Sequence, residues 1–163
     1  MPRLISSRKA KEKSALRAWL RATWKGGLHF IEYNMGGDAG LSDAQLYQTR
    51  RITPVELKTI RIGLRKGSVG LFNIDLRDGQ SEYHSELIQY GIGSIFIGMT
   101  SDQTVFGTTS IIIVHSGDGS VQSEHWRHLL THDDIEELVE DSWTAARKPR
   151  LVGGTHYKDG EAS

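Results

Sequence analysis

Two carboxylates and a lysine stand in the sequence at a spacing that could support phosphodiester hydrolysis. Asp43 lies thirteen residues before Glu56, and Lys58 follows Glu56 at the next position but one. If the two segments are neighbouring antiparallel strands, alternation places Glu56 and Lys58 on one face, and the hairpin can bring Asp43 opposite them. Carboxylate oxygens hold Mg²⁺ with several waters left on it, and such a metal both acidifies a water and neutralises a phosphate. The lysine can orient or deprotonate the attacking water, or stabilise charge in the transition state, and the backbone carbonyl of Leu57 would be a further metal ligand.

A simpler interpretation of Glu56 and Lys58 is an exposed strand face on which the two side chains pair with each other. The neighbouring Val55, Leu57 and Ile60 are apolar, so one face of this strand belongs to the core. A glutamate and a lysine in a central strand are costly to bury without a function. The apolar neighbours therefore favour a catalytic interpretation.

The first half of the chain predicts one helix followed by three strands. Residues 7–24 have apolar side chains at helical spacing on one face and basic side chains on the other, and a lysine with two glycines ends the pattern. Three stretches with strand character follow, separated by a glycine-rich turn at 35–40 and by two arginines. These stretches are 28–34, 44–49 and 54–60. They predict a meander whose second and third strands carry the chemical residues.

The second half predicts two helices and two further strands. One helix spans residues 80–90, the strands span 92–99 and 110–115, and a capping-box pattern at 131–134 begins a last helix that runs to about residue 147. The apolar run at 69–72 fits either a strand or a helical turn. Because the length suits one domain, we expect a single domain over residues 1–148 and a loose tail over residues 149–163.

The composition is that of a soluble globular protein, with 37% hydrophobic and 25% charged residues. No stretch approaches the ~20 apolar residues of a membrane helix, and the N-terminus lacks the apolar run of a secretory signal, so we expect a cytoplasmic protein. The absence of cysteine excludes disulfides and thiolate chemistry. Residues 1–66 carry 14 basic and 5 acidic residues, whereas residues 67–163 carry 6 and 15. This asymmetry is typical of a face that meets a polyanion, and a solvated basic helix without a partner explains it equally well.

In their order and spacing, four short motifs resemble the PD-(D/E)XK nuclease superfamily. The motifs are Gly-Leu-Ser-Asp at 40–43, Pro-Val-Glu-Leu-Lys at 54–58, Leu-Arg-Asp-Gly-Gln at 76–80 and Tyr-Gly-Ile at 90–92. They look like the turn, strand and glutamine-led helix of the VRR-NUC and Holliday-junction-resolvase-like branch. The resemblance covers roughly residues 10–98 and implies an α/β fold with a restriction-endonuclease-like core. That core is a helix, a three-stranded antiparallel meander, a helix and further strands, and this chain adds a C-terminal helix.

The resemblance also implies roles for individual residues. Asp43 and Glu56 would be metal ligands for Mg²⁺ or Mn²⁺, and Lys58 would be the catalytic lysine. Gln80 matches a glutamine that lies beside the active site in several branches. Many members also place a glutamate on the first helix near the metal, and Glu12 is the candidate here, with a surface pairing to a nearby basic residue as the alternative. Two departures from the family pattern are Ser42, in place of proline, and His84, in place of a tyrosine, which leaves open whether His84 touches DNA or faces solvent.

The implied activity is that of a metal-dependent endonuclease that hydrolyses DNA phosphodiester bonds, including those of branched or junction DNA. Basic residues just outside the core motif are expected to lie on loops around the site and to contact phosphates. They are Arg50, Arg51, Arg61, Arg65 and Lys66. The resemblance allows a homodimer, because resolvase-like members cut paired strands symmetrically.

Three alternatives stay open from the sequence. The chain could keep the nuclease fold as a catalytically inactive nucleic-acid-binding protein, although retention of all three chemical residues argues against this. It could also be a globular interaction protein in which the Glu-Leu-Lys motif is accidental. Finally, His125, His128 and His132 have a spacing that suits zinc only if one helix carries all three, which the intervening sequence does not predict.

Overall fold

The computed structural model describes residues 2–32, 42–63 and 70–148, with side chains from Lys11 onward. The helices are α1 (Pro2–Thr23), α2 (Gln80–Gln89), α3 (Ser110–Ser116) and α4 (His132–Arg147), with a short 3-10 helix at Ser123–His125. The strands are β1 (Gly27–Phe30), β2 (Ala44–Gln48), β3 (Arg51–Thr59), β4 (Arg61–Gly63), β5 (Leu71–Asn73), β6 (Ile95–Met99), β7 (Val105–Thr109), β8 (Ser120–Gln122) and β9 (Arg127–His128).

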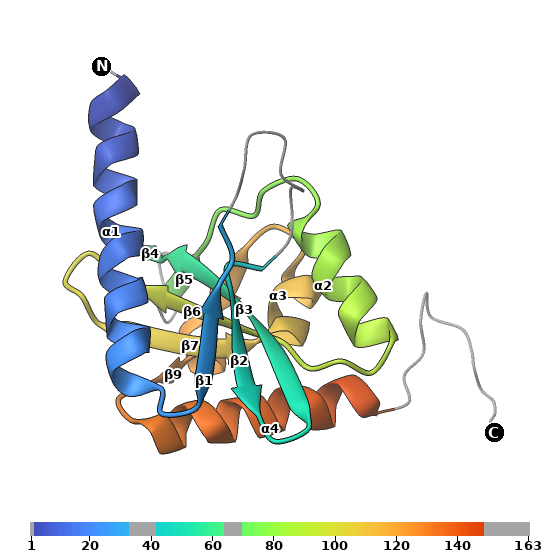
Figure 1. Cartoon of the computed structure of the whole chain (residues 1–163). Coiled ribbons are helices and arrows are strands. Elements are labelled where there is room, and N and C mark those ends of the chain that lie inside the picture. Colours follow the sequence, from blue (N-terminus) through green and yellow to red (C-terminus); the bar gives the residue numbers. More distant parts are fainter. Residues whose placement is uncertain (1, 33–41, 64–69, 149–163) are drawn as a thin grey trace.

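The main sheet has six strands in the order β1-β2-β3-β6-β7-β9 (Figure 1). Strands β1, β2 and β3 form the antiparallel meander that the sequence predicted. Strand β3 then pairs in parallel with β6, and the remaining neighbours are antiparallel. The fold is therefore a mixed α/β fold in which β3 and β6 lie at the centre of the sheet.

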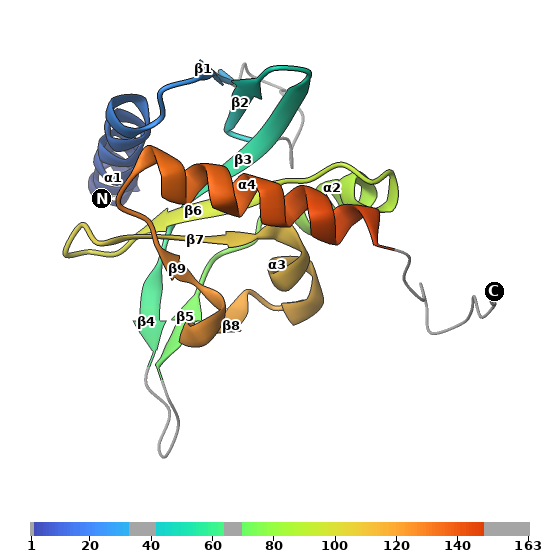
Figure 2. The ribbon, with the colours of Figure 1, turned by 90° about the horizontal axis from the view of Figure 1, so that it is seen from below.

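Helices α1 and α4 cover one face of this sheet (Figure 2). Leu16 and Leu20 of α1 pack together with Leu138 of α4 against alternate residues of the central strands, such as Leu57 and Ile97. Each of these five side chains is almost fully buried, and burying one such side chain stabilises the fold by about 1.5–3 kcal/mol. This core fixes the position of α1 beside β3.

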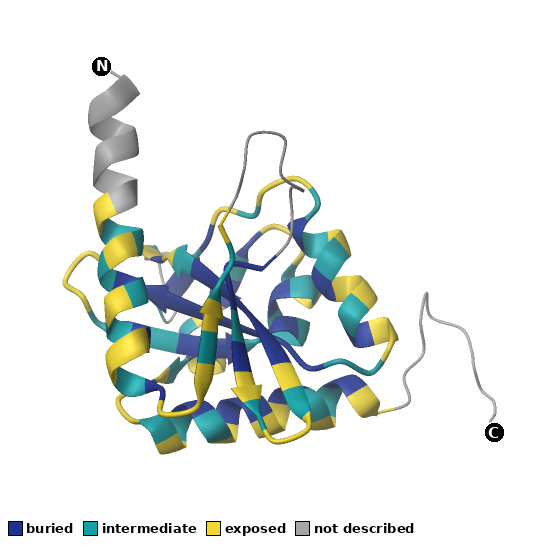
Figure 3. Cartoon of the chain, viewed as in Figure 1, coloured by how far each residue is buried: buried dark blue, intermediate teal, exposed yellow. Residues whose placement is uncertain are grey.

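The opposite face carries α2, α3 and a small sheet of order β4-β5-β8. Phe96 of β6 packs there with Phe72 of β5, Ile113 of α3 and Val121 of β8. Figure 3 shows that the middle of the central strands β3 and β6 is buried, because both faces of the sheet are covered there. Polar side chains on the central strands must therefore find partners inside the protein.

One predicted strand is a helix. Residues 110–115 were expected to be a strand because three isoleucines and a valine favour β structure. They form α3 instead, with only Ser110 and Ile113 buried, and the extended partner of β6 is the preceding segment, β7. Gly117, with φ of 74° in the left-handed region, ends the helix. One face of this helix packs against the apolar cluster of Phe72, Phe96 and Val121, and this packing outweighs the preference of isoleucine for strands.

Other expectations about the elements are confirmed. Helix α4 begins at a capping box in which the Thr131 hydroxyl accepts the N–H of Asp134 and the Asp134 carboxylate accepts the N–H of Thr131. The run at 69–72, left open by the sequence, contributes to strand β5. The turn at 35–40 and the tail at 149–163 lie outside the described residues. Within the described part of the chain, no helix is long and apolar enough to cross a membrane.

Candidate active site

Asp43, Glu56 and Lys58 come together at the sheet, as their spacing predicted. Asp43 directly precedes β2, and its backbone N–H donates to the carbonyl of Val55 at 3.0 Å, which places it beside Glu56 on the neighbouring strand. Glu56 and Lys58 lie on the face of β3 that α2 covers, since both contact Gln80 at the start of that helix. The strand alternation inferred from the sequence is therefore confirmed.

Asp43 is only 1% exposed and is surrounded by donors. Its Oδ2 accepts the backbone N–H of Leu57 at 2.9 Å, and its Oδ1 lies 3.1 Å from the Nζ of Lys13 on α1. Burial alone would raise the pKa of Asp43, but its hydrogen bond with Glu56, the Lys13 ammonium and the Leu57 N–H together lower the pKa below its usual value. Asp43 is therefore ionised at neutral pH.

Glu56 is fully buried and behaves in the opposite way. Its Oε2 accepts a hydrogen bond from the side-chain amide of Gln80 at 2.7 Å, whereas its Oε1 has no donor among the described residues. Burial and the adjacent charge of Asp43 raise the pKa of Glu56 to about 9. At neutral pH these two neighbouring carboxyl groups therefore hold one proton between them, which Glu56 carries.

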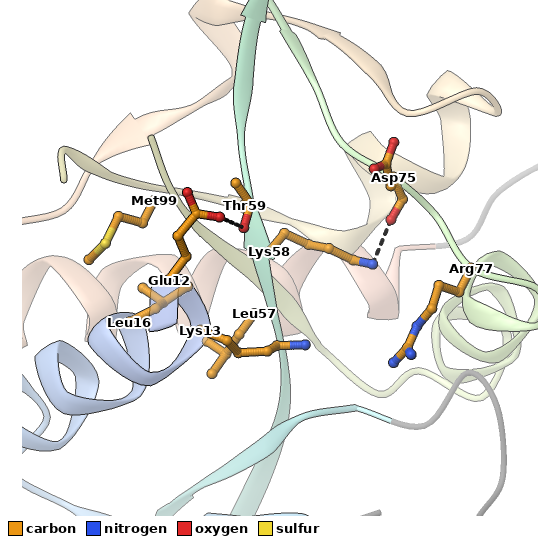
Figure 4. A pocket seen from close by; sticks show the side chains of 9 residues that line it. All are labelled: Glu12, Lys13, Leu16, Leu57, Lys58, Thr59, Asp75, Arg77 and Met99. Carbon is orange, nitrogen blue, oxygen red and sulfur yellow. Dashed lines mark hydrogen bonds between the residues drawn. The ribbon is translucent and has the colours of Figure 1, made fainter. Parts of the chain in front are cut away.

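Lys58 is held by two oxygens at the edge of a cavity (Figure 4). Its Nζ donates to the backbone carbonyl of Asp75 and to the side-chain oxygen of Gln80, both at 2.6 Å. Burial lowers the pKa of Lys58 to about 8, although the nearby Glu56 opposes that shift. An ammonium with this pKa can lose its proton close to physiological pH.

Gln80 links the carboxylate and the ammonium. It is fully buried, and one amide group donates to Glu56 while its oxygen accepts from Lys58 and from the backbone N–H of Arg77 at 2.7 Å. These hydrogen bonds can form in only one orientation of the Gln80 amide, because its NH₂ group must face Glu56 and its oxygen must face Lys58. Gln80 therefore fixes the relative positions of Glu56 and Lys58. The sequence prediction that this residue begins the helix beside the site is confirmed.

A cavity of about 300 Å³ opens beside Lys58, between α1 and the segment after β5 (Figure 4). Its lining combines apolar side chains with charged ones. The lining residues are Glu12, Lys13, Leu16, Leu57, Lys58, Thr59, Asp75, Arg77 and Met99. Three of them are basic and two are acidic, so the lining has a small excess of positive charge, which favours an anionic ligand at this place.

Glu12 reaches the cavity but makes its described contact elsewhere. Its Oε1 lies 3.4 Å from the hydroxyl of Thr59, on the far side of β3 from Glu56. Among the α1 residues whose side chains are described, Lys13 and not Glu12 contacts a carboxylate of the site. A role for Glu12 at the metal therefore stays a prediction, as does the ligand role of the Leu57 carbonyl, because the described contact of Leu57 uses its N–H.

Among the five predicted phosphate contacts, those that the structure describes are separated from one another. Arg61 lies next to the site, because its guanidinium pairs with Asp75 at 2.6 Å. The expectation that Arg50 and Arg51 flank the site does not hold. Arg51 begins β3, about 16 Å along the strand from Glu56, and there it pairs with Glu140 of α4. Arg65 and Lys66 lie outside the described residues.

Lys13 and His84 are site residues that the sequence prediction missed. Lys13 lies three positions before the buried Leu16, so its side of α1 could have been recognised from helical spacing. His84 follows Gln80 by one helical turn and is fully buried against Glu56, with its Nε2 3.5 Å from Oε1. Both roles considered for His84 from the sequence, a DNA contact or a solvent-facing side chain, are therefore wrong.

The donor set at Asp43 and Glu56 fits a hard divalent cation. Both residues offer carboxylate oxygens, they are buried neighbours on adjoining chain segments, and Oε1 of Glu56 has no donor within the described part of the chain. Two buried carboxylates in contact cannot both be ionised unless a cation lies between them, which is how such a pair holds Mg²⁺ or Mn²⁺. The Lys13 ammonium now neutralises Asp43 and would compete with the metal for that carboxylate.

A second group of potential ligands is less suitable. His132, Asp133 and Glu136 on α4 offer ligand atoms within 4.8 Å of one another. However, the Nδ1 of His132 accepts the backbone N–H of Lys25 at 3.0 Å, so its hydrogen lies on Nε2, the nitrogen that faces Glu136. That tautomer favours a hydrogen bond to Glu136 over a metal bond. His125 and His128 lie in other elements, so no single helix carries the three histidines, as the intervening sequence indicated.

The arrangement at β3 can bind a divalent cation, hold a lysine that loses its proton near neutral pH, and attract an anion into the adjoining cavity. The buried Asp43, Glu56 and Gln80 and the partly buried Lys13 and Lys58 supply these capabilities, together with the exposed Arg77 at the cavity. Comparisons of the chain with protein-family models, with curated proteins and with solved structures find no match.

Proposed function

We propose that this protein is a metal-dependent endonuclease of the PD-(D/E)XK kind, which hydrolyses DNA phosphodiester bonds with Mg²⁺ or Mn²⁺. The observation that supports the proposal most strongly is the placement of the buried Asp43 and Glu56 side by side on adjoining chain segments, with Lys58 tied to Glu56 through Gln80. The restriction-endonuclease-like core is part of the same proposal, which the order of the elements supports.

Asp43 and Glu56 would hold the divalent cation. When bound, the cation would supply Lewis acidity, which makes an attacking water more acidic and neutralises negative charge on the phosphate. Glu56 must lose its proton for this to happen, so metal binding should release a proton at neutral pH. Gln80 keeps one oxygen of Glu56 fixed during that change.

Lys58 would take up a proton from the attacking water. Because burial lowers its pKa to about 8, a useful fraction of its amine is neutral at pH 7–8. The water oxygen then forms the new bond to phosphorus, and the leaving oxygen of the cleaved strand takes a proton from solvent. The rate should rise with pH up to about 8 and then level off, as Lys58 becomes unprotonated.

Positive side chains near the cavity would bind the phosphates that flank the cleaved bond. Lys13 and Arg77 line the cavity itself, and Arg61 stands at its edge through its pairing with Asp75. Contacts to phosphates position DNA without reading its sequence. Branched or junction DNA, and a homodimer that cuts two strands, remain parts of the proposal that the family resemblance supports.

The proposal is tested by incubating labelled duplex, single-stranded, flap and four-way-junction DNA with the protein and Mg²⁺ or Mn²⁺. We expect cleavage of at least one substrate, loss of cleavage in EDTA, and loss in Glu56→Gln. Glu86→Gln, an exposed glutamate of α2, is the matched control and should cut like the wild type. Binding of DNA without cleavage would favour the inactive nuclease-fold alternative. If the protein neither binds nor cleaves DNA, both the nuclease and the inactive nuclease-fold alternative are refuted.

A further substitution separates two roles of the lysine. Lys58→Arg keeps a positive charge but cannot lose its proton near neutral pH. If Lys58 accepts the proton from water, Lys58→Arg is inactive. If the variant keeps most of the cleavage rate, the lysine acts through its charge alone. Lys25→Met, which changes an exposed lysine outside the site, controls for loss of a positive charge.

A further inference from the structure

A buried row of polar side chains continues from Glu56 away from the cavity. Its members are His84 of α2, Ser94 before β6 and Ser110 at the start of α3. Each is at most 2% exposed, and all three lie beyond Glu56 on the side of the main sheet that α2 and α3 cover. None of them lines the cavity beside Lys58. Buried polar groups of this kind cost stability unless they are paired, so their arrangement needs a reason.

The hydrogen bonds of this row determine which nitrogen of His84 carries its hydrogen. The hydroxyl of Ser94 donates to Oγ of Ser110 at 2.5 Å. Oγ of Ser110 lies 3.2 Å from Nδ1 of His84, and Oγ of Ser94 lies 3.0 Å from the same nitrogen. When Ser110 donates to Nδ1, both hydroxyl hydrogens have an acceptor, and the hydrogen of the neutral imidazole lies on Nε2. That N–H faces Glu56.

Nε2 of His84 and Oε1 of Glu56 are 3.5 Å apart, and within the described residues neither atom has a hydrogen-bond partner. A small approach of the two groups makes this a hydrogen bond once Glu56 is ionised. Gln80 already donates to the other oxygen, Oε2, at 2.7 Å. Successive turns of α2 thus present one donor to each oxygen of the same carboxylate.

Packing alone does not account for a histidine here. The ring of His84 lies against Phe96 at 4.8 Å and against Tyr83 at 5.1 Å between ring centroids. A phenylalanine would make the same ring contacts without burying two polar nitrogens. Its complete burial also excludes a direct contact with a substrate.

We propose that His84, held by Ser94 and Ser110, is a positioning residue that fixes the carboxylate of Glu56 for the divalent cation. The inference rests on the proposed function, because it assumes that Glu56 is a metal ligand. Partners that orient metal ligands in this way contribute about 10- to 100-fold to metal affinity. Ser94 and Ser110 belong to this arrangement, because their hydrogen bonds favour the His84 tautomer with its hydrogen on Nε2.

The test measures Mn²⁺ binding to the full-length protein without DNA, by titration calorimetry and by the loss of the free Mn²⁺ signal in electron paramagnetic resonance. We expect His84→Phe to bind Mn²⁺ about 10- to 100-fold more weakly than the wild type. Its thermal unfolding in EDTA should match or exceed the wild type, because the ring contacts remain. His84→Gln, which keeps a side-chain donor, should recover part of the affinity, and His115→Phe on the exposed side of α3 should have no effect.

Wild-type affinity in a folded His84→Phe would overturn the positioning role. If His84→Phe does not fold, the double substitution Ser94→Ala and Ser110→Ala carries the test, with the same expected loss and the same refuting result. The failures of the two proposals are distinguishable. If Mn²⁺ binding depends on His84 but the protein does not cleave DNA, only the nuclease is refuted. If cleavage requires Glu56 but Mn²⁺ binding is unchanged in His84→Phe, only the positioning role is refuted. No Mn²⁺ binding by the wild type would refute both.

Discussion

The shared proton of Asp43 and Glu56 makes the stability of the metal-free protein fall as pH rises through neutrality. Burial and Asp43 raise the pKa of Glu56 to about 9 from its usual value of 4.5. Between these values the folded protein holds one proton that the unfolded chain has released. Each pH unit in this window therefore lowers the free energy of unfolding by up to about 1.4 kcal/mol.

Two neighbouring groups limit the window in which this fall is visible. Burial lowers the pKa of His84 to about 4 from 6.5, so His84 makes stability rise with pH up to 6.5. Burial also lowers the pKa of Lys58 to about 8 from 10.5, so Lys58 makes stability rise above pH 8. Asp43 titrates below pH 3.8, outside this range. The titrations of His84 and Lys58 overlap the two ends of the pH range 6.5–8 and oppose the effect of Glu56 there. We therefore expect the free energy of unfolding to fall by about 1 kcal/mol between pH 6.5 and 8.

Urea unfolding in EDTA, followed by fluorescence of the four tryptophans, measures this change at pH 6.5, 7.0, 7.5 and 8.0. The wild type should lose stability across the series, and Glu56→Gln should not, because glutamine has no proton to release. Saturating Mg²⁺ should also remove the fall, since the metal displaces the proton. Equal pH dependence in the wild type and Glu56→Gln would refute the shared proton.

Two further substitutions test the ion pair of α1 and the cap of α4. Lys13→Met should bind Mg²⁺ about fivefold more tightly in calorimetry, because an ammonium 3.1 Å from Asp43 no longer competes and a partly exposed ion pair contributes about 1 kcal/mol. Arg17→Met, on the same helix, should leave the affinity unchanged, and weaker binding by Lys13→Met would contradict the competition. Thr131→Ala should lower the free energy of unfolding by about 1 kcal/mol in urea, because the capping box is lost. The exposed Thr144→Ala is its control, and equal stabilities would contradict a role of the cap.

Much of the fold followed from periodicity and turn residues. The meander, the helix that begins at Gln80 and the capped helix α4 were all readable, because each has a local pattern of apolar residues and a start or stop signal. Helix α3 was not, since its isoleucine-rich run favours a strand locally and only its packing against Phe96 and Val121 makes it helical. The pairing of β5 with β8 was equally unreadable, because it joins segments far apart in the chain.

The centre of the candidate site was predictable for a similar reason, and its surroundings were not. Two-residue alternation and one hairpin are enough to bring Asp43, Glu56 and Lys58 together. The contacts of Lys13 and His84 depend on how α1 and α2 pack on the sheet, which no spacing within the sequence specifies. The position of Arg51 at the far end of its strand depends on the length of β3, which begins three residues earlier than the pattern suggested.

The most direct test of the central claim is cleavage of labelled DNA at saturating protein, with Mn²⁺ and at pH 8, by wild type and by Glu56→Gln. Glutamine keeps the shape of the side chain and its contact with Gln80, so it removes the charged ligand with little change to the fold. We predict metal-dependent cleavage by the wild type and at least about a hundredfold slower cleavage by Glu56→Gln, as expected when a metal ligand is lost. Equal cleavage by both proteins would contradict a catalytic centre at Glu56, and absence of cleavage by the wild type on every DNA structure would contradict the nuclease.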